Sequence, residues 1–186
     1  MRMDPSLEKE LLNGAKRLDP KALAAIYDRY NTALYAYSMR LLGEADLAED
    51  CVAETFSRFL HALHAGKGPQ DYLQAYLYRI AHNWITDCYR LQPRQSFELD
   101  ENLHTDGQPT PSQTVDENLQ QGRIRAALRQ LTADQRQVIV LRFLEGWENE
   151  EVAVLLNKPI GAVKALQHRA LGALRKILAF DEMNEG

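Results

Sequence analysis

Hydrophobic side chains recur along most of this chain at alternating steps of three and four residues. Between Pro20 and Gly43 one set carries the repeat: Leu23, Tyr27, Tyr30, Leu34, Tyr37 and Leu41. This spacing predicts an amphipathic helix whose apolar stripe faces a core. Asp19 before Pro20 provides an N-cap for that helix, and Gly43 provides its stop.

The same pattern predicts two more helices in the first half of the chain. The first begins at Asp46, and its apolar face consists of Leu47, Cys51, Thr55, Phe59 and Leu63. The second runs from about Asp71 to Leu91, with a buried stripe of Leu73, Leu77, Ile80, Trp84, Cys88 and Leu91. The sequence GKGP at residues 66–69 separates the two. Because no segment alternates with a period of two for long enough to form a strand, the predicted fold class is all-α.

Helical periodicity is lost over residues 92–116, which are rich in Gln, Asp, Glu, Thr and Pro. This stretch is longer than the connections found inside compact domains, and its composition is typical of a flexible linker. We therefore predict two small helical domains, residues 1–91 and 117–186, joined by an acidic linker over 92–116.

The second predicted domain ends in a pair of helices joined by a tight turn. An earlier stripe consists of Ile124, Ala127, Leu128 and Leu131, and a capping box at Thr132 starts a helix that ends at Gly146. A short helix over 149–156, a turn over 157–159 and a long helix from Ile160 follow. This order predicts a helix-turn-helix, whose second helix fits the major groove of B-DNA. The alternative is an ordinary helical hairpin with a solvated basic face.

The charge of the chain is unevenly distributed, which changes what its formal net charge of −4 implies. Residues 1–91 carry 11 basic and 12 acidic side chains, residues 92–118 carry 1 and 6, and residues 119–186 carry 10 and 8. From Lys158 to Phe180 five basic residues occur with no acidic one. The net figure therefore hides a local basic patch of the kind that attracts nucleic acid.

The stretch from Leu131 to Lys176 resembles region 4 of the extracytoplasmic-function class of bacterial RNA polymerase sigma factors. In that family this region binds the minus-thirty-five promoter element. Position by position, the resemblance implies DNA contacts from two sets of residues. They are Arg142, Asn149 and Glu150 around the first helix of the motif, and Lys164, Ala165, His168 and Arg169 on the recognition helix.

A second resemblance lies in the helix predicted to end at Leu91. Residues 76–83, YLYRIAHN, resemble region 2 of the same family, with Tyr76 in place of the usual Trp. The resemblance implies that the opened minus-ten element is held by Lys67, Tyr76, Arg79, Asn83, Asp87 and Arg90. Aromatic rings stack on unpaired bases while cations follow the phosphates. For Tyr76 and Tyr89, a place in the core is an equally good interpretation.

The segment Ala48–Phe56 resembles family region 2.2, which grips the clamp helices of the polymerase β′ subunit. The resemblance implies that Asp50, Glu54 and Phe56 bind core polymerase, an interface of charged groups around an apolar anchor. It further implies promoter DNA, the polymerase β subunit and, as for many members, an anti-sigma factor as partners.

Other functions find little support in the sequence. No apolar run approaches the ~18–20 residues of a membrane span, so we expect a cytoplasmic protein. We expect no catalytic residues, metal or cofactor, because His61 and His64 lack the spacing of an established zinc site and no Gly-rich phosphate loop is present. The remaining rival is a conventional dimeric repressor or activator that uses the same helix-turn-helix on a palindromic operator.

Overall fold

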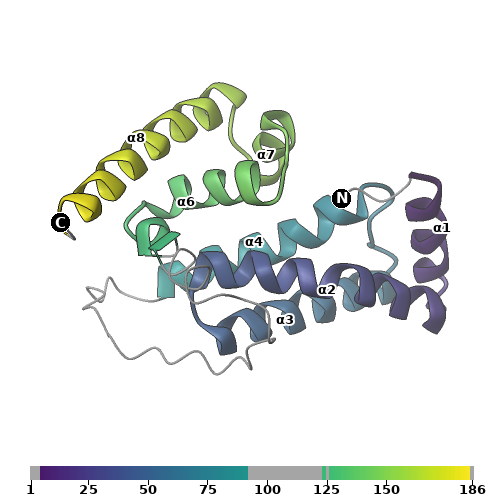
Figure 1. Cartoon of the computed structure of the whole chain (residues 1–186). Coiled ribbons are helices and arrows are strands. Elements are labelled where there is room, and N and C mark those ends of the chain that lie inside the picture. Colours follow the sequence, from purple (N-terminus) through teal and green to yellow (C-terminus); the bar gives the residue numbers. More distant parts are fainter. Residues whose placement is uncertain (1–4, 92–122, 125, 185–186) are drawn as a thin grey trace.

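The computed structural model describes residues 5–91, 123–124 and 126–184, and Figure 1 shows how their helices are arranged. The regular secondary structure of these residues is helical and contains no strand, which confirms the all-α class. The linker predicted over residues 92–116 lies outside the described residues.

The first unit consists of α1 (Pro5–Lys16), α2 (Pro20–Leu42), α3 (Ala45–His64) and α4 (Leu73–Leu91). The predicted ends of α2 are confirmed: the Asp19 carboxylate accepts a hydrogen bond from the Lys21 amide at 3.0 Å, and Gly43 adopts a left-handed φ of 79°. α2 packs against the other three helices. The core between them contains Leu34, Phe59 and Leu77, which are almost fully buried.

Two predicted stripes are confirmed only in part: the buried members include Tyr30, Leu34, Tyr37 and Leu41 on α2 and Leu73 and Leu77 on α4, whereas other members are not buried. On α2, Ile26 is buried and Tyr27 is 47% exposed. On α4 the buried hydrophobic side chains are Leu73, Leu77, Tyr78, Ala81 and Ile85, whereas Ile80, Trp84 and Cys88 are only partly buried. The reason for the difference on α4 is that α4 contacts α2, α3 and α7 together, so neighbours from the second half of the chain set its buried face.

The second unit contains helical residues at 123–124 and 126–129, then α6 (Ala133–Ile139), the π-helical turn η1 (Val140–Leu144), α7 (Asn149–Leu156) and α8 (Ile160–Asn184). The predicted capping box at Thr132 is present. The expected place of Ile124 on the buried stripe is wrong, since it is about half exposed. The helix predicted to run from Thr132 to Gly146 is α-helical only as far as Ile139, and a π-helical turn, which holds more residues than an α-helical one, follows it.

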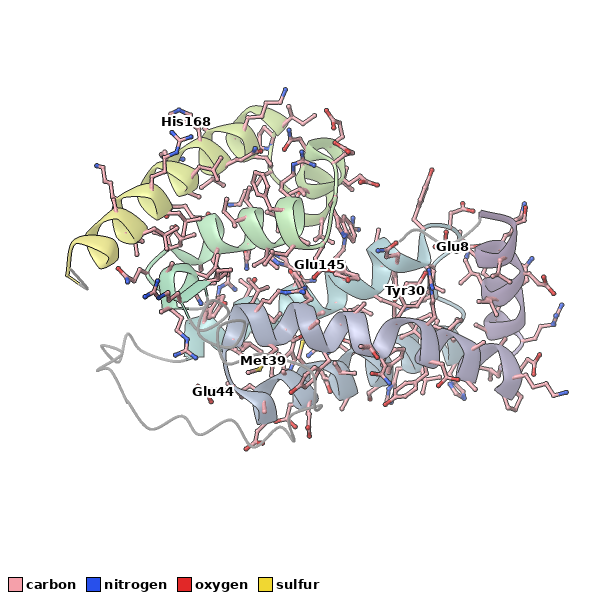
Figure 2. The ribbon with its side chains drawn as sticks, viewed as in Figure 1. Glu8, Tyr30, Met39, Glu44, Glu145 and His168 are labelled. Atoms are coloured by element: carbon pink, nitrogen blue, oxygen red, sulfur yellow. The ribbon has the colours of Figure 1, made fainter. Side chains whose placement is uncertain are left out.

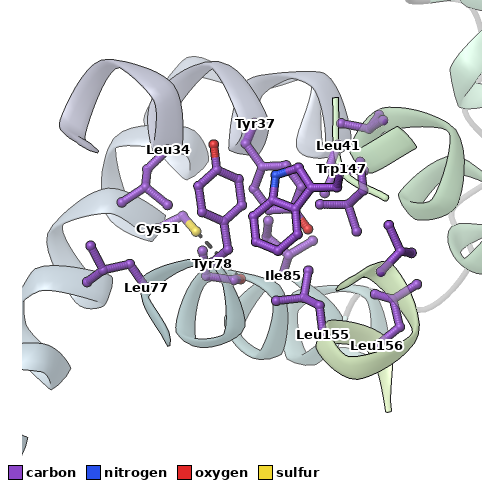
Figure 3. Close-up of a cluster of buried hydrophobic side chains, with 14 of the residues drawn as sticks. Leu34, Tyr37, Leu41, Cys51, Leu77, Tyr78, Ile85, Trp147, Leu155 and Leu156 are labelled. Carbon is purple, nitrogen blue, oxygen red and sulfur yellow. Dashed lines mark hydrogen bonds between the residues drawn. The ribbon is translucent and has the colours of Figure 1, made fainter. Parts of the chain in front are cut away.

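The two units pack directly against each other around one continuous core. The ring centroids of Tyr78 on α4 and Trp147, which follows η1, lie 5.0 Å apart, and Figure 3 shows Trp147 among side chains of both units. The Glu145 carboxylate accepts hydrogen bonds from the Tyr78 hydroxyl at 2.8 Å and from the Arg40 guanidinium. Contacts between units therefore combine apolar burial with buried polar bonds.

Arg136 is a further polar link between the units. The residue is 8% exposed, and its guanidinium donates to the Leu128 carbonyl of its own unit and to the Leu41 carbonyl at the end of α2, both at 2.8 Å. Nearby, the Tyr89 hydroxyl donates to the same Leu41 carbonyl at 2.7 Å. A buried guanidinium is costly unless its donors are satisfied, and here carbonyl groups of two units satisfy them.

Candidate nucleic-acid interface

The predicted helix-turn-helix is formed by α7 and α8. Asn157 ends α7 with a left-handed φ of 51°, a conformation that Asn tolerates better than most residues, and Pro159 directly precedes α8. The two helices contact each other, and both carry buried side chains: Val152, Ala153, Leu155, Leu156, Val163 and Ala170. Because these contacts fix the angle between the helices, the outer face of α8 is held as a rigid surface.

That outer face presents the recognition residues expected from the sequence. Lys164, Ala165, His168 and Arg169 are all exposed. Figure 2 places His168 on the side of α8 that points away from the first unit. No acidic residue occurs on α8 before Asp181, so the surface is positively charged along most of the helix. An exposed basic helix face of this kind suits the phosphates and base edges of a major groove.

The three residues expected around the first helix of the motif differ in availability. Glu150 is exposed, and Asn149 is partly buried. The Arg142 guanidinium donates to the Trp147 carbonyl and lies 3.3 Å from the Glu148 carboxylate. Arg142 therefore stabilises the loop between η1 and α7, in addition to any role at the surface.

A second exposed polar face runs along α4. Arg79, Asn83, Asp87 and Arg90 are exposed, and their spacing places them on one side of the helix. Asp87 and Arg90 form a loose ion pair at 3.8 Å. The structure thus brings together four of the six residues expected at the minus-ten element.

The loop before α4 adds Lys67 and a residue that the sequence reasoning missed. Tyr72 is 79% exposed and has a left-handed φ of 55°. Helix α1 fixes this loop, because the Lys16 ammonium lies 3.1 Å from the Gln70 amide oxygen and the Glu8 carboxylate accepts from the Gln74 amide at 3.3 Å. The signal available in the sequence was an aromatic residue that falls off the periodic stripe, beside a Gly-Pro break.

The structure distinguishes Tyr76 from Tyr89, for which a place in the core and a place at the DNA surface were equally good interpretations. Tyr76 is partly buried, with its ring edge-on to Phe59 at 6.2 Å, so part of it faces the core. Tyr89 bonds to the Leu41 carbonyl and lies under the Arg136 guanidinium, which is 5.8 Å from the ring centroid. Burial raises the pKa of Tyr89 despite that guanidinium. The geometry thus favours the structural interpretation of Tyr89.

The residues expected to bind polymerase lie together on α3. Asp50 is exposed, and Glu54 accepts a hydrogen bond from Arg58 at 2.7 Å on the same helix. Phe56 is partly buried, with its ring centroid 4.9 Å from that of Tyr27 on α2. These two aromatic rings form an apolar patch beside the acidic residues, which has the composition of a protein interface.

Two titratable groups at the contact between the units are strongly perturbed. Burial and the neighbouring Glu145 carboxylate raise the pKa of Tyr78 well above its usual value, so its hydroxyl remains a hydrogen-bond donor. Burial lowers the pKa of His82 to about 4; Lys158 acts in the same direction and Asp134 against it. Neutral His82 is therefore the form that this contact accommodates at neutral pH.

Across the described residues, no three or more His, Cys, Asp or Glu side chains are grouped so that they could hold a metal ion. The ring nitrogens of His61 and His64 lie within 2.9 Å of carbonyls one turn earlier on α3. A separate finding is that none of the helices in this part of the chain combines the length and the apolar character needed to cross a bilayer.

The chain matches two protein-family models, Sigma-70 region 2 over residues 26–95 and Sigma-70, region 4 over residues 111–174. It is 31% identical to the ECF RNA polymerase sigma factor BldN of Streptomyces coelicolor, covering 96% of this chain and 68% of that protein. It is 33% identical to the ECF RNA polymerase sigma factor SigL of Mycobacterium tuberculosis, covering 90% and 94% of the two chains.

Two solved structures resemble the chain over both units. One is CnrH in complex with the cytosolic domain of CnrY, with a TM-score of 0.71 and 25% identity, covering 94% of this chain and 98% of that one. The other is the sigma factor RpoE in complex with the anti-sigma factor NepR from Bartonella quintana, with a TM-score of 0.67 and 25% identity, covering 87% and 99%.

Proposed function

Because the chain belongs to the ECF class of RNA polymerase sigma factors, we propose that its two exposed polar faces contact one promoter at two places. As a member of this class it directs RNA polymerase to particular promoters for transcription initiation. In the proposal, α8 reads the minus-thirty-five element, and α4 with its preceding loop holds the opened minus-ten element.

The observation that carries the first assignment is the exposed face of α8 at the helix-turn-helix. Lys164, His168 and Arg169 are solvent-accessible at the N-terminal half of the helix, where a recognition helix meets base edges. Asn149 and Glu150 lie at the start of α7, and Arg142 lies in η1. Of these, Glu150 is the most available, because Arg142 is bonded within its own loop.

At the minus-ten element we assign phosphate and base contacts to Lys67, Arg79, Asn83 and Arg90, with Asp87 paired to Arg90. Tyr72 joins this set as a stacking surface for an unpaired base, since its ring is almost free of protein contact on an anchored loop. Tyr76 contributes only its exposed part. Each stacked base is worth ~1–3 kcal/mol, enough to favour melted DNA over duplex at one or two positions.

The remaining partners follow from the same premise. Asp50, Glu54 and Phe56 on α3 form the contact to the β′ clamp helices of core polymerase, and the second unit contacts the β subunit. A relative of similar structure is bound to an anti-sigma factor, and we propose such a partner for this chain. The protein acts in the cytoplasm and has no catalytic role of its own.

The test is fluorescence anisotropy with a labelled promoter fragment. We expect tight, specific binding only when core polymerase is added, because neither surface alone makes enough contacts. Tight binding of the free chain to a palindromic site, with a stable dimer on size exclusion and no affinity for core enzyme, is the result expected for a conventional repressor. That result would overturn the assignment of both surfaces.

A further inference from the structure

The free chain holds its two DNA-contacting units against each other through a specific set of bonds. The contact includes the carboxylate of Glu145, which is 10% exposed, and the indole of Trp147, which is 7% exposed. Figure 2 shows Glu145 between the two groups of helices. Both units also supply residues to the same buried core, among them Tyr37, Tyr78 and Leu155 (Figure 3).

In this closed arrangement the two surfaces lie too close together to contact both promoter elements at once. The minus-ten and minus-thirty-five elements are ~25 base pairs apart, which is ~85 Å at 3.4 Å per base pair. A compact body of this chain length has a radius of gyration of ~16 Å and a diameter of ~40 Å. Two surfaces on one such body cannot reach both elements, so the units have to separate. At ~3.3–3.6 Å per extended residue, the chain between Leu91 and Arg123 is long enough to permit this.

Separation of the two units affects the hydrogen bonds of Arg136 and those of Glu145 differently. Arg136 keeps its bonds to the carbonyls of Leu128, Arg129 and Leu131, which belong to its own unit. Glu145 has the opposite arrangement, because its two partners, Arg40 on α2 and Tyr78 on α4, both lie across the contact. Opening therefore breaks the Glu145 bonds as a set, whereas Arg136 loses its bonds to Leu41 and Tyr89 but keeps three carbonyl partners.

We propose that Glu145, bonded to Arg40 and Tyr78, is a latch that keeps the free sigma factor closed, and that binding of core polymerase releases it. This inference rests on the proposed function, since it concerns how the two surfaces become available. The binding energy of polymerase has to offset the latch, so the chain binds core enzyme more weakly than its open form does. Trp147 adds the apolar part of the same contact.

The experiment compares the full chain with Glu145→Ala. In the closed state this substitution leaves the buried Tyr78 hydroxyl without its acceptor, whereas it costs nothing in the open state. We expect a larger radius of gyration by small-angle X-ray scattering, and about tenfold tighter binding to core polymerase by anisotropy of an N-terminally labelled chain. In a Trp84→Phe background, which leaves Trp147 as the only tryptophan, the emission should also shift to longer wavelength.

Glu10→Ala is the matched control, because Glu10 is an exposed glutamate on α1, at the far end of the molecule from the contact (Figure 1). It should change neither measurement. Tyr78→Phe is the second variant: it keeps the ring in the core, removes only the donor, and should shift both readouts in the same direction. If loss of the circular dichroism signal at 222 nm shows that Glu145→Ala has unfolded, the comparison of Tyr78→Phe with wild type tests the latch instead.

Two negative results have different meanings. If wild type and both variants bind core polymerase equally well and scatter alike, the latch is wrong and the proposed function stands. If none of them binds core polymerase, the proposed function itself fails. Tighter binding without expansion also overturns the latch, because the gain would then come from a new contact.

Discussion

The two surfaces proposed to contact the promoter are built in different ways. The α8 surface is a single rigid helix face that is basic and free of acids until Asp181. The α4 surface is composite: it joins a helix face with mixed charges to a loop that carries an exposed aromatic ring. A rigid cationic helix suits a duplex groove, whereas an aromatic ring beside scattered cations suits unpaired bases. The contrast supports the proposal that each half is specialised for one state of the DNA.

The largest effect tests the duplex-reading half. In holoenzyme, replacing Lys164 and Arg169 together by Ala should weaken binding to a duplex promoter by about 2–4 kcal/mol, because each contact is worth ~1–3 kcal/mol. The slope of affinity against salt should also fall by about 2. Filter binding over a salt series measures both. Arg175→Ala, a control further along α8, should have little effect. Equal losses of affinity on a premelted fork lacking the minus-thirty-five element would contradict the assignment of the α8 surface to duplex DNA.

The next largest effect concerns His82, which is buried at the contact between the two units. The folded pKa of His82, about 4, lies below the value near 6.5 expected for the unfolded chain, so between these values the unfolded state binds more protons. The resulting stability is complete above pH 6.5 and is lost as the pH falls towards 4, by up to about 3 kcal/mol. Urea unfolding at pH 7 and pH 4.5 should show a smaller decline for His82→Gln than for wild type. Parallel declines would mean that His82 does not contribute to acid sensitivity.

A smaller effect tests the single-strand half. Tyr72→Ala should weaken promoter opening by about 1–3 kcal/mol, because one stacking partner is lost. Tyr72→Phe should keep most of the activity, since the ring remains. Fluorescence of 2-aminopurine in the minus-ten element follows the opening, and binding to closed duplex should be unchanged in both variants. A deficit of Tyr72→Ala in duplex binding rather than in opening would remove Tyr72 from this surface.

The smallest effect separates basic residues that belong to the fold from those that belong to the DNA surface. Lys158 lies in the turn before α8 and is bonded to Asp134 at 3.0 Å. Because this ion pair is largely solvated, Lys158→Ala should lower the unfolding free energy by no more than about 1 kcal/mol. Promoter affinity should hardly change. A loss as large as that of the Lys164 and Arg169 variant would extend the recognition surface into the turn.

The sequence predicted the elements well wherever the signal was local. The ends of α2, the capping box at Thr132 and the bounds of α7 follow from residues within a few positions of each other. The exposed residues expected on α8 were found there for the same reason, because helical spacing fixes which side chains share a face. Errors arose at Tyr27 and Ile80, where neighbouring helices set which face is buried.

The sequence by itself therefore determined the helices, their caps, the helix-turn-helix and the family, since all of these are written in short-range patterns. Only the tertiary structure decided that the units share a core and that Glu145 bonds across it. Its partners Arg40 and Tyr78 are 105 and 67 residues away, a separation that no periodicity encodes. The tertiary structure also decided the exposure of Tyr72, because hydrogen bonds with α1 anchor the loop that carries it. Long-range packing selects among the faces that local patterns make available, and here it determined which polar groups are buried and which remain free for DNA.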